Sequence, residues 1–554
     1  MRCTWPQLTP RRDAGILPGM KKHTPAPSAP RRPKAPAAAP AAVPARGGRI
    51  IGTYLAKARG FGFLVPDDPV AGGDLFVPEG ESMDAMTGDR VAAVVLPGSG
   101  QDGQARARID EVLSRARNRF VGELARTSDG GWEVRPQGRI LNRPIRVDDV
   151  GPAEGEGVKV VVELTRFPKG SEPGRGVIVE NLGTPGPADV ETLGILREHG
   201  LPDGFPDAVL EAARVAALSF DPEAPGREDF TASTVLTIDP DDARDFDDAL
   251  GVTACGDGWT LAVHIADVSA FVTEGSPLDD SARERGNSTY FPRRVVPMLP
   301  ETLSNGVCSL QPGQVRFVKS VFIDYDAGGN VLAARFANGR IRSARRLTYL
   351  EAQSILDGRT GGYPAEVVDT LMELERLART IEQRRREEGM LHLDLPEVEL
   401  VLSPDGRVVD ARAADDSYTH TLVEMFMVEA NEAVARLLDS LHVPFLRRIH
   451  PDSDDAAGKD LSTFLKACGL KVPKVLDRTA IQELVDRVAA TPLSRAVNLA
   501  LLRTLKRAVY SPQDIGHYAL ASRHYCHFTS PIRRYPDLTV HRLLDAHLRG
   551  TLAA

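Results

Sequence analysis

The chain has 554 residues, of which 42% are hydrophobic and 26% charged, and its formal net charge is −8. These values are ordinary for a soluble protein with several domains. They exclude a membrane-spanning chain, because no apolar run is long enough to cross a bilayer, so we expect no membrane partner. The first residues lack a secretory apolar segment, and the five cysteines are scattered without a C-x-x-C pair. Both features favour reduced thiols and a cytoplasmic location.

Residues 1–48 are predicted to form a basic, disordered arm. No acidic residue occurs from Ala14 to Pro66, and the span from Thr24 to Ala45 is rich in proline and alanine. Such a composition does not bury enough apolar surface to fold. The arm is consistent with a tether that contacts phosphates, with a solubilising tail or with an organellar transit peptide, and these alternatives stay open.

Residues 49–116 are predicted to form a small β-barrel, because short apolar runs alternate with glycine and aspartate. The segments RGFGFLV (59–65) and DLFVP (74–78) resemble the two RNA-contacting strands of cold-shock domains. Strand alternation places Phe61 and Phe63 on one face, where exposed rings stack on bases without reading sequence. The alternative is that Phe61, Phe63 or Phe76 packs in the barrel core, but the glycine neighbours favour exposed rings.

The next segments continue the β pattern and then change to a helical one. Residues 117–184 contain FVGEL (120–124), WEVRP (132–136) and VKVVVELTRF (158–167), which predict a second OB-like barrel without a clear stacking motif. Residues 185–229 are predicted to be a helical connector. Residues 230–554 are predicted to form one further, larger domain.

An acidic segment, TIDPDDARDFDDA (237–249), carries the clearest chemical signal. It contains four aspartates in the spacing D-x5-D-x-D-D, namely Asp239, Asp245, Asp247 and Asp248. Apolar strand-like stretches flank it, so we expect a partly buried turn and not a solvated acidic loop. Carboxylates at this density repel one another unless cations join them, and hard oxygen ligands suit Mg²⁺ or Mn²⁺. Two such ions about 4 Å apart can hold a phosphodiester and generate the attacking hydroxide. An EF-hand loop is excluded, because Arg244 stands where that loop requires glycine.

The same segment is similar to the signature of the exoribonuclease II / ribonuclease R family, whose catalytic domain is called RNB. Three further blocks resemble the family in the same order, VHIADVS (263–269), GNSTYFPRRVVPMLPETLSNGVCSL (286–310) and HFTSPIRRYPDL (527–538). Their sequences are more similar to ribonuclease R than to exoribonuclease II. The resemblance implies an α+β multidomain protein, in which cold-shock-like OB barrels precede a mixed α/β RNB domain.

The resemblance also implies an activity. A monomer of this family would hydrolyse single-stranded RNA from 3′ to 5′ and release nucleoside 5′-monophosphates, in RNA decay and processing. The ribonuclease R likeness extends this expectation to structured RNA. Mg²⁺ would be the cofactor, with Mn²⁺ as a substitute, and RNA would be preferred over DNA through 2′-hydroxyl contacts.

Family roles can be carried over residue by residue. The metal ligands correspond to Asp239, Asp245, Asp247 and Asp248. Among them, loss of Asp247 should be the most damaging. Tyr290 and Tyr349 match tyrosines around the 3′ nucleotides, where a clamped ring orients the scissile phosphate, and Tyr349 is expected to contribute to catalysis. From spacing alone, ordinary half-buried rings would be the favoured interpretation of both tyrosines.

Two more positions match the family's site. Arg533, in SPIRRY (530–535), corresponds to a catalytic arginine, whose planar guanidinium can bind two phosphate oxygens at once. Its neighbour Arg534 is expected to pair with an acid or to contact backbone phosphate. Glu424 matches a glutamate near the nucleotide sugar, although a solvated helix face is an equally good interpretation, and Met425 replaces the second acid that often follows. The stretch 503–542 has the basic and aromatic mixture of a channel for single-stranded RNA.

The resemblance ends near Gly550, whereas family members normally continue with further helices and a final OB-fold domain. We therefore expect a truncated or short variant without that domain. Two other functions are considered, a non-catalytic cold-shock-type RNA-binding or chaperone protein and a metal nuclease acting on DNA. The intact set of four carboxylates argues against the first, and only the resemblance and the cold-shock-like barrel argue against the second.

Overall fold

The computed structural model describes residues 47–552 except for 58–59, 69, 71–72, 100–103, 139, 142, 152–154, 170–171, 394, 396, 453–454 and 473–476. The predicted arm of residues 1–48 therefore lies almost entirely outside the described part of the chain.

Two closed five-stranded barrels follow each other at the start of the described chain. The first has the strand order β1-β2-β3-β5-β4 and consists of β1 (Arg49–Ala56), β2 (Gly62–Pro66), β3 (Leu75–Val77), β4 (Arg90–Ser99) and β5 (Ala105–Ser114). The second has the order β10-β8-β7-β6-β9 and consists of β6 (Arg119–Arg126), β7 (Trp132–Pro136), β8 (Ile145–Val147), β9 (Lys159–Arg166) and β10 (Gly174–Gly183). Alternate residues of each strand fill the barrel interior. The predicted pair of OB-type barrels is confirmed.

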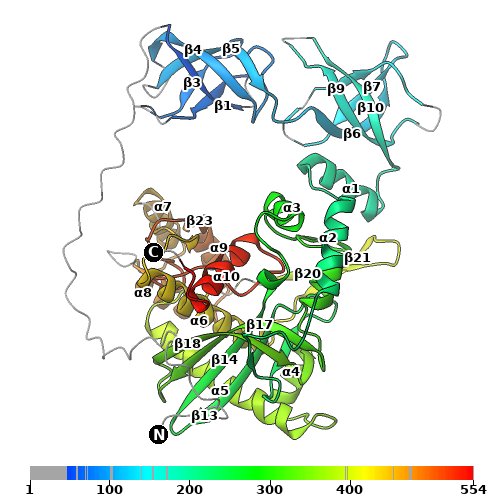
Figure 1. Ribbon diagram of the computed structural model, residues 1–554. Coiled ribbons are helices and arrows are strands. Elements are labelled where there is room, and N and C mark those ends of the chain that lie inside the picture. Colours follow the sequence, from blue (N-terminus) through cyan, green and yellow to red (C-terminus); the bar gives the residue numbers. More distant parts are fainter. Residues whose placement is uncertain are drawn as a thin grey trace.

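Two helices lead from the barrels to an α/β body (Figure 1). Helix α1 (Ala188–His199) packs against β6 and β9 of the second barrel. Helix α2 (Asp207–Leu218) packs against the body, where it meets α3 (Pro277–Arg285) and the π-helical turn η2 (Thr302–Val307). Both helices lie within residues 185–229, the segment expected to be helical.

A seven-stranded mixed sheet forms the centre of the body, with the order β11-β18-β17-β14-β13-β12-β19. Its strands are β11 (Glu228–Asp229), β12 (Leu236–Asp239), β13 (Asp248–Cys255), β14 (Gly258–Ala266), β17 (Val315–Tyr325), β18 (Val331–Arg342) and β19 (Arg345–Thr348). Only the pairs β12–β19 and β11–β18 are parallel. Helices cover both faces, so central strands such as β14 are buried along almost their whole length.

The two faces of the sheet have separate apolar cores. One core packs against α4 (Tyr349–Leu356), α5 (Ala365–Glu387) and the long α6 (Tyr418–Ser440). The other packs against α2, α3 and η2. The last helix, α10 (Tyr535–Leu548), contributes Val540 and Leu544 to the first core and Leu538 to the second. It therefore anchors the segment that precedes it to the sheet.

The remaining elements of the body lie outside its central sheet. They are the short 3-10 turn η1 (Val268–Ala270), the hairpin of β15 (Thr289–Phe291) and β16 (Arg294–Val296), the exposed hairpin of β20 (Val398–Leu402) and β21 (Val408–Ala413), the pair of β22 (Arg447–Ile449) and β23 (Val509–Ser511), and the helices α7 (Asp455–Ala467), α8 (Arg478–Val488) and α9 (Ser494–Thr504). The last three helices are inserted between β22 and β23 and share a small core of their own.

Two expectations about the environment of the chain can be compared with the structure. Among the described residues, no helix combines the length and the apolar character that crossing a membrane requires. The thiols of Cys308, Cys468 and Cys526 are free.

Candidate active site

The acidic segment joins two neighbouring strands of the sheet. Asp239 is the last residue of β12 and Asp248 is the first residue of β13, and these strands pair in antiparallel fashion. The predicted strand–turn–strand arrangement is confirmed. Because antiparallel neighbours bring the end of one strand beside the start of the next, the turn places Asp239, Asp247 and Asp248 around one cavity.

Two of the three carboxylates are almost fully buried, and Asp248 is half-buried. Asp239 is 6% exposed and Asp247 is 3% exposed. Burial and then the charge of Asp248 raise the pKa of Asp239 to about 8. Burial likewise raises the pKa of Asp247 to about 7 and that of Asp248 to about 6, although Arg533 opposes both shifts. Each group is therefore held where its negative charge is poorly compensated by the protein.

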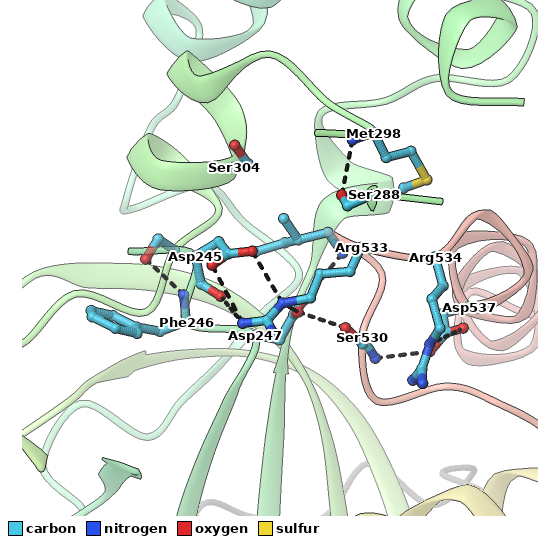
Figure 2. Close-up of polar contacts among 12 residues, drawn as sticks. Asp245, Phe246, Asp247, Ser288, Met298, Ser304, Ser530, Arg533, Arg534 and Asp537 are labelled. Atoms are coloured by element: carbon cyan, nitrogen blue, oxygen red, sulfur yellow. Dashed lines mark hydrogen bonds and ion pairs between the residues drawn. The ribbon is translucent and has the colours of Figure 1, made fainter. Parts of the chain in front are cut away.

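Arg533 reaches two of the aspartates from the segment before α10 (Figure 2). Its Nε lies 3.0 Å from Oδ2 of Asp245 and 3.2 Å from Oδ2 of Asp247, at ion-pair distance but outside hydrogen-bond geometry. Its Nη2 donates to the backbone oxygen of Asp245 at 3.1 Å and to Oδ1 at 3.3 Å. The guanidinium therefore joins the acidic turn to a segment 288 positions away in the sequence.

Asp247 and Asp239 differ in their protein partners. Oδ2 of Asp247 accepts a hydrogen bond from the hydroxyl of Ser530 at 2.7 Å, and Oδ1 accepts one from the backbone N–H of Ile532 at 3.1 Å. Oδ2 of Asp239 is buried, and no described residue donates a hydrogen bond to it. A buried carboxylate oxygen without a donor is unfavourable unless a proton or a cation satisfies it.

A cavity of about 420 Å³ gathers six of the predicted site residues, and others, from four separate parts of the chain. Its wall includes Asp239, Asp247, Asp248, Tyr349, Glu424 and Arg533. Further lining residues come from the basic and aromatic stretch 503–542, namely His517, Leu520, Tyr525, His527, Thr529, Ser530 and Arg534. Met427 and Asn431 of α6 were not expected in the wall. Ser530 was not predicted as a site residue, although it lies three residues before Arg533 in the same SPIRRY block.

Tyr349 reaches this cavity through the parallel pairing of β12 with β19. Asp239 is in register with Thr348, so Tyr349 follows directly at the same edge of the sheet. A capping box between Thr348 and Glu351 begins α4 at this point. The ring of Tyr349 stacks on His420 with centroids 3.7 Å apart. The half-buried ring expected from spacing alone thus lines the cavity.

Tyr290 and Glu424 lie at the margins of the site. Tyr290, on β15, is 52% exposed, and its hydroxyl lies 3.5 Å from Oδ2 of Asp245. Neither Tyr290 nor Asp245 lines the cavity itself. Glu424 lies on α6 and is solvent-exposed, yet it forms part of the cavity wall. The exposed position fits a solvated helix face, and contact of Glu424 with a nucleotide sugar stays a prediction.

The three phenylalanines of the first barrel form a cluster on its outer face. The ring centroids of Phe61, Phe63 and Phe76 lie 5.5–5.9 Å apart, and all three side chains are half-buried. Their strand neighbours Leu64 and Leu75 fill the interior of the barrel. The alternative that these rings form the barrel core is wrong.

We expect the Phe63→Ala change to weaken binding of single-stranded RNA by roughly 5- to 100-fold, because loss of one base-stacking ring costs about 1–3 kcal/mol. Fluorescence anisotropy with a labelled oligonucleotide measures this change. The Ile51→Ala change removes an exposed apolar side chain from the same barrel outside the cluster and serves as the control. Equal affinity of the Phe63 variant and the control would show that the cluster does not bind RNA.

The raised pKa of Asp239 leads to a prediction about stability without metal. Its ordinary value is 3.8 and its value in the folded chain is about 8, so the ionised carboxylate destabilises the folded state progressively as the pH rises between them. The Asp239→Asn variant lacks this penalty. In EDTA, we expect its unfolding temperature to exceed that of the unchanged chain at about pH 8, and the difference to vanish near pH 4. A difference independent of pH would contradict the assigned burial.

Comparisons with known proteins agree with this architecture. Family models match residues 227–550 as an RNB domain, residues 134–206 as a cold shock domain and residues 52–112 as a ribonuclease B OB domain. The cold-shock match thus falls on the second barrel and the following helix, whereas the sequence pattern placed cold-shock likeness in the first barrel. The fold and the family models define a member of the RNB family.

Within that family, the chain belongs with the ribonuclease R proteins. It is 35% identical over 508 residues to ribonuclease R of Aquifex aeolicus, covering 90% of this chain and 71% of the relative. It is 35% identical over 515 residues to ribonuclease R of Escherichia coli, covering 91% of this chain and 62% of the relative. This membership supports exoribonuclease activity.

Solved structures show the same relationship. Mycoplasma genitalium RNase R in complex with ribose-methylated single-stranded RNA superimposes with a TM-score of 0.82 and 26% identity, covering 90% of this chain and 79% of that chain. Yeast Ssd1, described as a pseudonuclease, shares the fold with a TM-score of 0.68 and 19% identity, covering 91% of this chain and 70% of that chain. Because a pseudonuclease has the same fold, the fold does not establish catalytic activity. Activity depends on the residues of the cavity.

Proposed function

We propose that the chain is a divalent-metal-dependent 3′→5′ exoribonuclease that hydrolyses single-stranded RNA to nucleoside 5′-monophosphates. The observation that supports this function best is the meeting of Asp239, Asp247, Asp248 and Arg533 at one cavity. Acids and one arginine in this arrangement suit phosphodiester hydrolysis, in which negative charge develops on the phosphate and on the leaving oxygen.

The carboxylates divide into two kinds, and this division fits Mg²⁺. Oδ2 of Asp239 is buried without a protein donor among the described residues. Asp248 is influenced by burial and by the charges of Arg533 and Arg534. These two groups are best suited to hold a cation, with Mn²⁺ as a substitute. Asp245 and Asp247, which also contact Arg533, would complete a set for two ions. When bound, the ions would lower the pKa of a water molecule and neutralise charge on the phosphate.

The protein's own groups would bind and orient the strand. The Arg533 guanidinium lies beside Asp245 and Asp247, where it can bind oxygens of the scissile phosphate and stabilise the charge that develops on it. Tyr349 lines the cavity and would stack on the terminal base, while Tyr290 at the rim would contact the preceding nucleotide. Glu424 faces the same space and would contact the sugar. The Phe61, Phe63 and Phe76 cluster would bind the upstream strand.

RNA as substrate is supported by the relatives. Solved complexes of Mycoplasma genitalium RNase R contain single-stranded and double-stranded RNA. We propose the same substrate class here, including structured RNA, with a role in RNA decay and processing. We also propose that the chain acts as a monomer in the cytoplasm. The non-catalytic RNA-binding function is less well supported, because such a protein needs no buried carboxylates around an arginine.

A labelled-strand assay tests the proposal. The chain is incubated with 5′-labelled single-stranded RNA, and separately with DNA of the same sequence, in Mg²⁺ or in EDTA. We expect stepwise 3′ shortening of RNA only, with loss of activity in EDTA. Binding without shortening would instead support the chaperone function, and shortening of DNA at the same rate would support the general metal nuclease.

A further inference from the structure

A fifth carboxylate, Asp537, lies outside the acidic turn. It lies in the first turn of α10, is 0% exposed and does not line the cavity. Its Oδ1 accepts the backbone N–H of Ser530 at 2.8 Å, and the side chain of Arg534 donates to both of its oxygens at 2.7–3.1 Å. Asp537 therefore holds the backbone at Ser530 and one arginine, but it is too deeply buried to touch RNA.

Ser530 connects this buried carboxylate to the acidic turn (Figure 2). Its backbone N–H donates to Asp537, and its hydroxyl donates to Oδ2 of Asp247 at 2.7 Å. The same Oδ2 lies 3.2 Å from Nε of Arg533. The serine hydroxyl and the arginine therefore both approach Oδ2 of Asp247. Because the hydroxyl already donates a hydrogen bond to this oxygen, Asp247 binds the Arg533 guanidinium only in part.

We propose that Ser530 and Asp537 form a positioning relay for hydrolysis, an inference that rests on the proposed exoribonuclease function. Asp537 fixes the backbone of Ser530, and the Ser530 hydroxyl fixes the orientation of the Asp247 carboxylate. Without the hydroxyl, Arg533 is the nearest side-chain donor to Oδ2 of Asp247 and is drawn towards it. The arginine then becomes less available to a phosphate. The relay acts through Asp247 and Arg533 and does not itself contact the reacting atoms.

Three variants separate positioning from simple structural support. The Ser530→Ala change removes the hydroxyl, and the Ser530→Thr change keeps it. The Thr539→Val change removes a hydroxyl of α10 that, within the described part of the chain, bonds only to the backbone oxygen of Pro536. Steady-state hydrolysis of single-stranded RNA gives kcat and KM, and thermal unfolding reports the fold.

For Ser530→Ala we expect kcat to fall by about 10- to 100-fold, because a hydrogen bond to a charged group that orients the reaction is lost. KM and the unfolding temperature should stay near those of the unchanged chain. Ser530→Thr should recover most of kcat, and Thr539→Val should leave both parameters unchanged. A loss in Ser530→Ala that Ser530→Thr does not restore, or a change confined to KM, would overturn the relay.

A double-variant experiment tests the link to Asp537. The Asp537→Asn change keeps an acceptor for Ser530 but removes the charge that faces Arg534. If the two residues act in one relay, the double variant Ser530→Ala/Asp537→Asn should lose no more kcat than the stronger single variant. Losses that multiply would show independent roles and overturn the relay. If Asp537→Asn does not fold, the Ser530 variants alone decide.

The outcomes also distinguish this inference from the function on which it rests. If the unchanged chain does not shorten RNA in Mg²⁺, the proposed exoribonuclease function fails. If the unchanged chain shortens RNA and Ser530→Ala does so equally fast, the function stands and the relay is wrong.

Discussion

Replacing Asp247 by asparagine is expected to lower RNA hydrolysis by roughly 10³-fold or more, because the change removes the charge that a cation and Arg533 require at the centre of the site. The folded structure should survive. Asparagine has nearly the same size, and its amide oxygen can still accept the bond from Ser530 or from Ile532. Burial raises the pKa of Asp247 to about 7, so a neutral side chain removes a destabilising charge above that pH.

Single-turnover hydrolysis of 5′-labelled RNA in Mg²⁺ measures this loss, and circular dichroism with thermal unfolding verifies the fold. The matched control is Asp242→Asn, which removes an exposed aspartate from the same turn. We expect the control to keep its activity, because its carboxylate lies outside the cavity. Comparable rates in the two variants would show that hydrolysis does not take place at this cavity.

The Arg533→Lys change is expected to reduce kcat by about 10²-fold. Lysine keeps the positive charge but cannot reproduce the planar fork, which lies near both Asp245 and Asp247 and would bind two phosphate oxygens at once. We expect a smaller effect on KM than on kcat, because the upstream barrels and tyrosines still bind the strand. The variant therefore separates stabilisation of the developing charge from binding of RNA.

Steady-state kinetics on a short single-stranded RNA test this expectation. Arg283→Lys is the matched control, because Arg283 is an exposed arginine of α3 whose one ion-pair partner among the described residues is Asp280. Unchanged kcat in the Arg533 variant, or a fall of the same size in the control, would remove Arg533 from the proposed mechanism.

Local pattern predicted the acidic turn well. The hydrophobic flanks of residues 237–249 predicted two strands joined by a partly buried turn, and β12 and β13 have this arrangement. Strand alternation also placed Phe61 and Phe63 on one outer face of the first barrel. Such predictions succeed because the period of a strand and the chemistry of a short turn are encoded by neighbouring residues.

The local sequence pattern could not predict which residues, distant in the sequence, meet in the folded chain. Spacing alone favoured ordinary half-buried rings for Tyr290 and Tyr349, yet the parallel pairing of β12 with β19 brings Tyr349 to the cavity.

By itself, the sequence determined the ordered series of two barrels, a helical connector and an α/β body, together with the identity of the four clustered carboxylates. Only the tertiary structure decided which of them meet Arg533, which keep oxygens without a protein donor, and how Ser530 and Asp537 support them. The physical reason is that a carboxylate's pKa and partners depend on burial and on residues almost three hundred positions away, which come together only when α10 packs between the two cores of the sheet.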